Sequence, residues 1–138
     1  MIIDSHQHFW NYDPIKDAWI DDSMEAIRRD FLPKDLKPLL EKNGVDGCIA
    51  VQADQSEEET DFLLNCAEKN KFIKGVVGWL DLTSENLEKR LDYYVKNPFL
   101  KGLRHIVQAE KDDYLLRRDV QKGISKLAKY NLTNDILV

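Results

Sequence analysis

Residues 47–82, GCIAVQADQSEEETDFLLNCAEKNKFIKGVVGWLDL, place one helical pattern between two short apolar runs. The runs at 47–53 and 72–82 are almost continuously apolar, which is typical of strands buried on both faces of a parallel sheet. Between them, Ser56 and Glu59 have the spacing of a capping box, and apolar residues then recur at helical spacing. This stretch therefore predicts strand, helix and strand, the βαβ unit of an α/β fold.

The same alternation continues on both sides of this unit. The other predicted strands are 1–6, 100–108 and the beginning of a strand at 135–138. The other predicted helices are 33–44, 84–97 and 118–131. Residues 9–33 are a long irregular stretch rich in aromatic and acidic residues, and such loops are uncommon in a compact domain unless they have a function. We expect one α/β domain over residues 1–138, with a parallel sheet.

Composition excludes several classes of partner. The chain has 138 residues, enough for one domain with a sizeable core. A net charge of −5 and a pI near 5.2 argue against binding to nucleic acid or to an anionic membrane. No apolar run of about 18 residues or more is present, so we expect no membrane span.

The cysteines and the N-terminus bear on the compartment. The first residues lack the basic and apolar regions of a secretory signal. Cys48 and Cys66 lie in a predicted strand and a predicted helix, where we expect buried free thiols rather than a disulfide. These features favour a cytoplasmic protein.

Two histidines and an aspartate follow the apolar start of the first predicted strand. Alternate residues of a strand point to one face, so we expect Asp4, His6 and His8 on the same side, at the carboxyl end where α/β proteins gather function. Neutral imidazoles suit zinc and similar divalent ions. Asp4 is expected either to orient a ligand histidine or to bond to the backbone. A polar strand end without a metal is the alternative.

Arg104 and His105 form a second polar cluster, in the predicted strand 100–108. Neighbours on a strand face opposite ways, so only one of the two is expected to point into a pocket. Arg104 suits a substrate oxygen or carboxylate, and a buried arginine needs a partner. His105 is a metal ligand, a proton carrier or a packed side chain. Gln52 and Trp79 lie at the carboxyl rim, where they are candidate walls of a substrate site.

Several segments together resemble a known family. They are IDSHQHFW, RRDFLPKDLKPLL, GVDGCIAVQA, GVVGWLDL, LKGLRHIVQ and the terminal NDILV. In this order they resemble the amidohydrolase superfamily, and within it the sugar lactonase branch of L-fuconolactonase-like and L-rhamnonolactonase-like proteins. The resemblance runs from Ile2 to Val138, and the ordered series is more specific than any single segment.

The resemblance implies a (β/α)8 TIM barrel, of which this chain would cover roughly the first four βα units and the start of strand five. It also implies a divalent metal, most often zinc, bound by His6 and His8, and hydrolysis of a sugar lactone to its hydroxy acid by water. Arg104 and His105 match a block of the family, which suggests substrate binding by Arg104 and a catalytic role for His105. The expected partner is a small sugar lactone.

The chain also departs from the family pattern. A complete barrel needs about 250 residues, and the family's later histidine and its last-strand aspartate have no counterpart here. We therefore expect the N-terminal half of a barrel, whose open sheet edges favour self-association. Two other readings stay open: a flavodoxin-like binding module, and a remnant that binds a metal or a sugar acid without turnover.

Overall fold

A computed structural model of the chain describes residues 1–137. Five strands alternate with four α-helices along the chain. The strands are β1 (Ile3–Gln7), β2 (Gly47–Val51), β3 (Ile73–Gly78), β4 (Leu100–Ile106) and β5 (Thr133–Leu137). The α-helices are α1 (Pro33–Lys42), α2 (Glu57–Lys69), α3 (Leu87–Tyr94) and α4 (Arg118–Leu127). The predicted order of strands and helices is confirmed.

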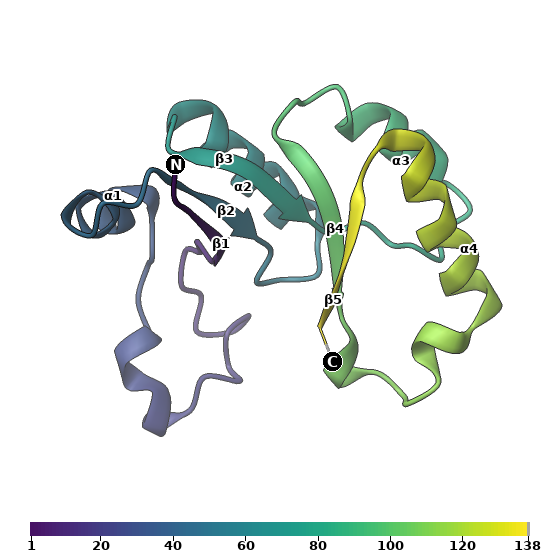
Figure 1. Cartoon of the computed structure of the whole chain (residues 1–138). Coiled ribbons are helices and arrows are strands. Elements are labelled where there is room, and N and C mark those ends of the chain that lie inside the picture. The colour runs from purple at the N-terminus through teal and green to yellow at the C-terminus, as the bar shows by residue number, and fades with distance from the viewer. Residues whose placement is uncertain (138) are drawn as a thin grey trace.

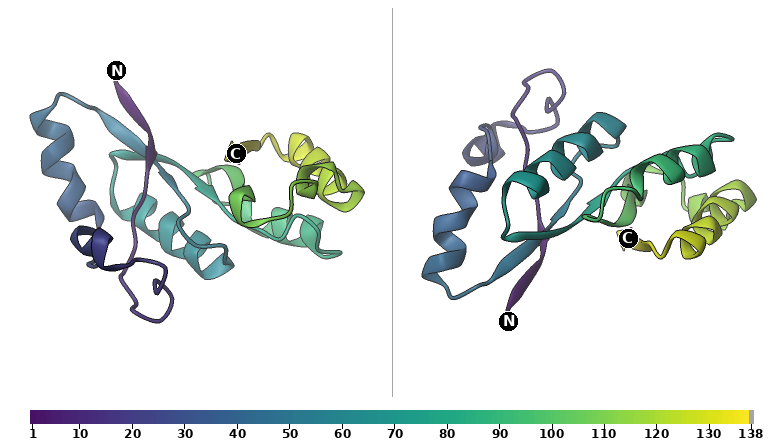
Figure 2. Two further views of the ribbon diagram at one scale, coloured as in Figure 1. Left: turned by 90° about the horizontal axis from the view of Figure 1, so that it is seen from below. Right: turned by 90° about the horizontal axis from the view of Figure 1, so that it is seen from above.

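The five strands form one curved parallel sheet. Their order is β1-β2-β3-β4-β5, and each strand pairs with the next one along the chain. The helices lie around the outside of the strands, as the two views of Figure 2 and the cartoon in Figure 1 show. This arrangement is a half-barrel. The flavodoxin-like alternative is wrong, because that fold has strand order 2-1-3-4-5.

The hydrophobic core lies between the sheet and the helices. Its largest wholly buried members include Leu63, Ile73, Leu91 and Leu103, which come from α2, β3, α3 and β4. Burial of such side chains contributes about 1.5–3 kcal/mol each, before the loss of conformational entropy. The packing of these side chains holds each strand against its helix. The polar residues considered below lie at the carboxyl ends of the strands, beyond this core.

Some element boundaries differ from the prediction, and local hydrogen bonds explain one of these differences. The helix predicted to begin at 84 begins at Leu87, because Asp81 first forms a turn whose carboxylate accepts from the backbone N–H and the hydroxyl of Thr83. Strand β4 ends at Ile106, and β5 begins at Thr133 instead of 135. The last residue of the predicted strand 135–138 lies outside the described residues.

The capping box predicted at the start of α2 is only half formed. The Ser56 hydroxyl accepts from the backbone N–H of Glu59 at 3.1 Å, as expected. The carboxylate of Glu59 instead accepts from the backbone N–H of Ala53, at 3.1 Å. Glu59 is 8 % exposed. A buried carboxylate therefore lies under the loop that joins β2 to α2.

The long segment before α1 is ordered by local and by distant contacts. Trp10 and Phe31 form an antiparallel bridge with two backbone hydrogen bonds of 3.0 Å. Between them, a short 3-10 helix covers Asp22–Ile27.

Cys48 and Cys66 are free and buried, as predicted. Within residues 1–137, no helix combines the length and apolarity needed to cross a bilayer.

Candidate metal and substrate site

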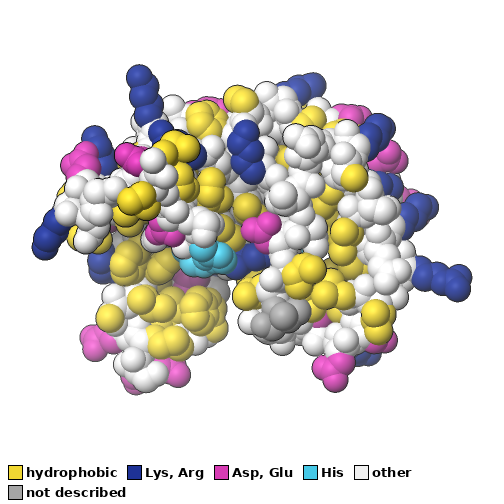
Figure 3. All heavy atoms as spheres, in the orientation of Figure 1, with side chains coloured by type: hydrophobic (Ala, Val, Ile, Leu, Met, Phe, Trp, Pro, Cys, Tyr) yellow, Lys and Arg dark blue, Asp and Glu magenta, His cyan; other side chains and the backbone are white. Residues whose placement is uncertain are grey.

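His6 and His8 meet where β1 ends, at the carboxyl edge of the sheet. Their Nε2 atoms are 3.1 Å apart, and their ring planes are nearly perpendicular. Two nitrogens bound to one tetrahedral zinc ion at 2.0–2.1 Å would be about 3.3 Å apart. Figure 3 shows histidine side chains in the middle of the viewed face, beside a hollow and next to charged side chains. The two imidazoles therefore converge at the spacing of metal ligands.

The hydrogen bonds of the two rings define where their lone pairs point. His8 Nδ1 is 2.9 Å from the carbonyl oxygen of Val51, which can only accept, so Nδ1 carries a proton. Burial lowers the pKa of His8, which favours the neutral ring with a lone pair on Nε2. Arg104 Nη1, which can only donate, lies 3.3 Å from His6 Nε2. His8 Nε2 therefore presents its lone pair to His6 Nε2, and either a proton on His6 Nε2 or a shared cation can lie between the two nitrogens.

Arg104 points to the same face as His6 and is almost wholly buried. Its Nη2 donates to the backbone carbonyl of Gln52 and, at 3.0 Å, to the side-chain oxygen of Gln52. Gln52 in turn donates from Nε2 to the carbonyl of Arg104 at 3.2 Å. Among residues 1–137, the buried Nε of Arg104 has no hydrogen-bond partner, and the carboxylate of Asp135 acts on the guanidinium without a salt bridge. Burial lowers the pKa of Arg104.

The carboxylate of Asp4 bonds to the backbone next to the histidines and not, within residues 1–137, to either of their rings. This carboxylate accepts from the backbone N–H of His6 at 3.1 Å, the second of the two predicted roles. Strand β1 is also less regular than predicted, because Asp4 pairs with Cys48 while Gln7 pairs with Ala50, which leaves one extra residue in β1.

His105 faces the opposite side of β4 from Arg104, so only one of the pair points to the histidines, as predicted. Its Nδ1 accepts from the indole N–H of Trp79 at 3.2 Å, and its Nε2 lies 2.9 Å from Glu110. The ring also stacks on Tyr114, with centroids 4.6 Å apart. Trp79 is held by Thr60, whose hydroxyl accepts from its backbone N–H at 2.8 Å. His105 and Trp79 thus form a cluster separate from His6 and His8.

The residues present fit part of a metal site. His6 and His8 supply two nitrogen ligands, whereas catalytic zinc sites use three protein ligands and a water. Within residues 1–137, no group of three or more histidine, cysteine, aspartate or glutamate side chains converges. The chain therefore brings two ligands to this point, and a complete site needs groups from elsewhere.

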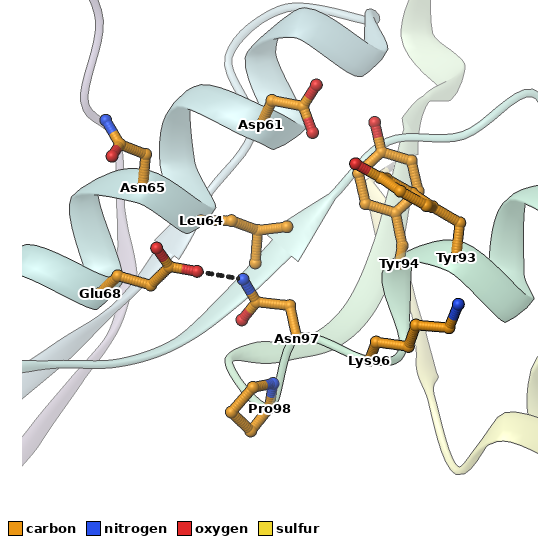
Figure 4. Close-up of a pocket in the computed structure, with 9 residues that line it drawn as sticks. All are labelled: Asp61, Leu64, Asn65, Glu68, Tyr93, Tyr94, Lys96, Asn97 and Pro98. Atoms are coloured by element: carbon orange, nitrogen blue, oxygen red, sulfur yellow. Dashed lines mark hydrogen bonds between the residues drawn. The ribbon is translucent and has the colours of Figure 1, made fainter.

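Three cavities differ in what surrounds them. One of about 430 Å³ lies on the outer surface between α2 and α3, with Glu68 bonded to Asn97 beside Tyr93 and Tyr94 (Figure 4). It contains none of the candidate site residues. A second, of about 290 Å³, lies at the carboxyl rim and is also not lined by any candidate site residue, whereas a third, of about 250 Å³, is lined by His8. We call His6, His8, Gln52 and Arg104 the histidine–arginine cluster. The second cavity is bordered by Trp10, two residues after His8, and by Ile106, two residues after Arg104.

Some residues of the site were not foreseen from the sequence. Val51 orients His8 through a backbone carbonyl, which no side-chain pattern reveals. Gln55 accepts from the backbone N–H of Ile106 at 2.7 Å and so joins the ends of β2 and β4. Asp135 lies in register with Arg104 on the neighbouring strand. The apolar run around Arg104 was a usable signal, because a buried cation requires polar partners.

The chain is similar to known proteins over its whole length. The family model described as Amidohydrolase matches residues 3–138. An L-fucono-1,5-lactonase of Burkholderia multivorans is 38% identical over 138 residues, which are 99% of this chain and 46% of that protein. An L-fucono-1,5-lactonase of Burkholderia ambifaria is 34% identical over 137 residues, 99% of this chain and 47% of that protein.

A solved structure agrees with this relationship. The crystal structure of an amidohydrolase from Burkholderia multivorans with bound zinc has a TM-score of 0.95 and 37% identity, and the match covers 100% of this chain and 49% of that one. The chain spans about half the length of the relatives it matches. The match to residues 3–138, together with this likeness, shows that the chain belongs to the amidohydrolase family.

Proposed function

We propose that this chain carries part of the active site of a zinc-dependent lactonase, which opens a sugar lactone to its hydroxy acid. The observation that carries the proposal is the approach of His6 Nε2 to His8 Nε2 at 3.1 Å, beside a buried arginine whose guanidinium Gln52 holds in place. The names of the relatives support the lactone, and the bound zinc of the solved amidohydrolase supports the metal.

Each residue of the cluster then has a chemical role. His6 and His8 would hold the ion, which supplies polarisation of the lactone carbonyl and a more acidic bound water. Arg104 would donate from its guanidinium to the carbonyl oxygen, which gains negative charge as water adds to the carbon. Gln52 would keep the guanidinium in place through the two oxygens that it offers to Nη2. The ring C–O bond then breaks, leaving a carboxylate and a hydroxyl.

His105 has another set of contacts and needs a separate test. Its two ring nitrogens are occupied by Trp79 and Glu110, and it lies on the face of β4 opposite to Arg104. A catalytic role for His105 stays a prediction from the family resemblance. The contacts of its ring with Trp79 and Tyr114 support a role in positioning the carboxyl rim.

The remaining ligands must come from outside residues 1–137, and we propose a second copy of the chain as one source. Strands β1 and β5 are the edges of the sheet, and unpaired edges favour association. Ile2 and Ile136 at these edges are 60% and 63% exposed.

Native mass spectrometry at increasing protein concentration should show a dimer. A species that stays monomeric at about 100 µM, well above the micromolar affinity of a moderately stable interface, would contradict this assembly.

Hydrolysis of L-fucono-1,5-lactone in the presence of zinc tests the function itself. We expect His6→Gln and His8→Gln to abolish both zinc binding and turnover, whereas the matched variant His105→Gln should retain the zinc. Loss of turnover with zinc retained in His105→Gln would support its catalytic role. Equal zinc binding by His8→Gln and the parent chain would refute the metal site.

A second candidate function is binding without turnover. It is favoured by the convergence of only two metal ligands within the described residues. Zinc bound at the histidine pair, with no lactone hydrolysis above the spontaneous rate at any protein concentration, would establish this function for the 138-residue chain.

A further inference from the structure

The cavity of about 290 Å³ at the carboxyl rim is lined by residues that are close in sequence to the histidine–arginine cluster. Its walls come from three segments that lead away from the site: Trp10 is two residues after His8, Ala53 directly follows Gln52, and Ile106 is two residues after Arg104. A cavity of this size approaches the lower limit of small-molecule sites, which is about 300 Å³. The cavity is therefore large enough for part of a small ring.

The charges around this cavity are mainly negative. Asp17, Asp54 and Glu59 line it, with Lys16 as the cation among the lining residues. Lys16 is already paired with Asp54, at 2.8 Å. Glu59 is buried beneath the loop that follows β2, and its carboxylate accepts from Ala53. The cavity offers acceptors for hydroxyl groups and repels a carboxylate.

The same cavity has an aromatic wall. Trp10 and Trp19 both line it, and Trp19 is 64% exposed. An exposed indole face suits the apolar C–H face of a sugar ring, while nearby oxygens bind the hydroxyls at its edge. Trp10 is fixed by the backbone bridge to Phe31, so the wall is attached to the rest of the fold.

The opposite end of the site has the opposite charge. Arg104 lies beside His6 and forms no salt bridge within residues 1–137, although the carboxylate of Asp135 is near enough to oppose the lowering of its pKa by burial. A lactone has a carbonyl end and a neutral end that carries hydroxyl groups. We propose that the rim cavity binds the neutral hydroxyl-bearing side of the ring against Trp19, with the carbonyl end directed to Arg104. This inference rests on the proposed function and adds to it the orientation of the substrate and a subsite.

The orientation also affects the product. Hydrolysis creates a carboxylate, which the acidic cavity disfavours and the Arg104 end favours. The open acid can therefore occupy the site in one direction only, and removal of an acidic side chain from the cavity should weaken that preference.

Isothermal titration calorimetry with two probes tests the inference. L-fucose is a neutral ring that cannot be hydrolysed as a lactone, and L-fuconate is the open acid. Trp19→Ala should weaken L-fucose binding by about threefold to tenfold, the range for loss of one aromatic contact. The matched control Tyr93→Ala removes another exposed aromatic side chain, on the outer surface shown in Figure 4, and should leave the affinity unchanged.

Asp17→Asn tests the charge. Removal of one negative charge at roughly 7 Å in water should strengthen L-fuconate binding by about threefold. The same variant keeps an acceptor oxygen for hydroxyl groups, so it should change the affinity for neutral L-fucose less than the affinity for L-fuconate. An equal change for both probes, or no change for L-fuconate, would overturn the proposed charge polarity.

The outcomes separate this inference from the proposed function. Binding of L-fucose that depends on Trp19 but not on zinc or His6, in a chain without lactonase activity, would leave the subsite standing and the proposed function refuted. Zinc binding and turnover with no effect of Trp19→Ala would refute the subsite alone. Absence of L-fucose binding to the parent chain would also refute the subsite.

Discussion

The guanidinium of Arg104 should weaken metal binding at the histidine pair, and this effect can be measured. Its Nη1 atom is 3.3 Å from His6 Nε2, the atom that would hold the ion. With a zinc–nitrogen distance of 2.0–2.1 Å, the two positive charges would lie about 4–5 Å apart. Because His6 is exposed, we use the dielectric constant of water, for which a unit charge and a divalent ion at this distance repel by about 2 kcal/mol.

Arg104→Gln removes the charge and keeps a donor for Gln52. We therefore expect zinc to bind about 30-fold more tightly to this variant, because about 2 kcal/mol corresponds to that factor in the dissociation constant. Arg104→Lys is the matched control, since it keeps the charge, and its zinc affinity should stay within about threefold of the parent value. A competition titration against a chromophoric zinc chelator measures all three proteins at one pH.

One result would refute this reasoning. If Arg104→Gln and Arg104→Lys bind zinc equally tightly, the guanidinium does not face the ion, and its contact with His6 does not describe the metal-bound state. Thermal unfolding without zinc serves as the folding control, because loss of the guanidinium removes bonds to two buried oxygens of Gln52. Lactone hydrolysis should fall in Arg104→Gln even though zinc binds more tightly, since the donor to the carbonyl oxygen loses its charge.

Three further predictions concern stability and reactivity. Gly123→Ala should lower the free energy of unfolding by about 1–3 kcal/mol, because the new Cβ would lie 2.0 Å from the carbonyl oxygen of Leu82. Gly44→Ala should lower it by about 1 kcal/mol, through the positive φ of Gly44 alone. Urea titrations of the two variants measure both effects. Burial raises the pKa of Glu59, so the stability it contributes is complete below the unfolded pKa of about 4.3 and is lost as the pH rises through the folded pKa. Glu59→Gln should therefore flatten the decline of stability from pH 4 to 7, and an unchanged slope would contradict the assignment. Burial raises the pKa of Cys48 to about 12, so this thiol should react with a disulfide reagent only after unfolding, and a rapid reaction in the folded chain would contradict its burial.

The sequence determined the order of strands and helices, because that order depends on local patterns. Continuous apolar runs indicated strands buried on both faces, and helical spacing between them indicated the covering helices. The same reasoning placed Arg104 and His105 on opposite faces of one strand, since side chains alternate along any regular strand. It also placed His6 and His8 close enough to share an ion.

Only the tertiary structure decided which partners these residues have. Arg104 is turned to His6 and held by Gln52, 52 residues earlier in the chain, and His8 is oriented by a carbonyl 43 residues later. Glu59 left the predicted capping box for the N–H of Ala53. Such bonds depend on which strands lie side by side and on the residue at which each strand ends. The spacing of residues along one segment carries no information on either, so the geometry of the site is decided only when the sheet is assembled.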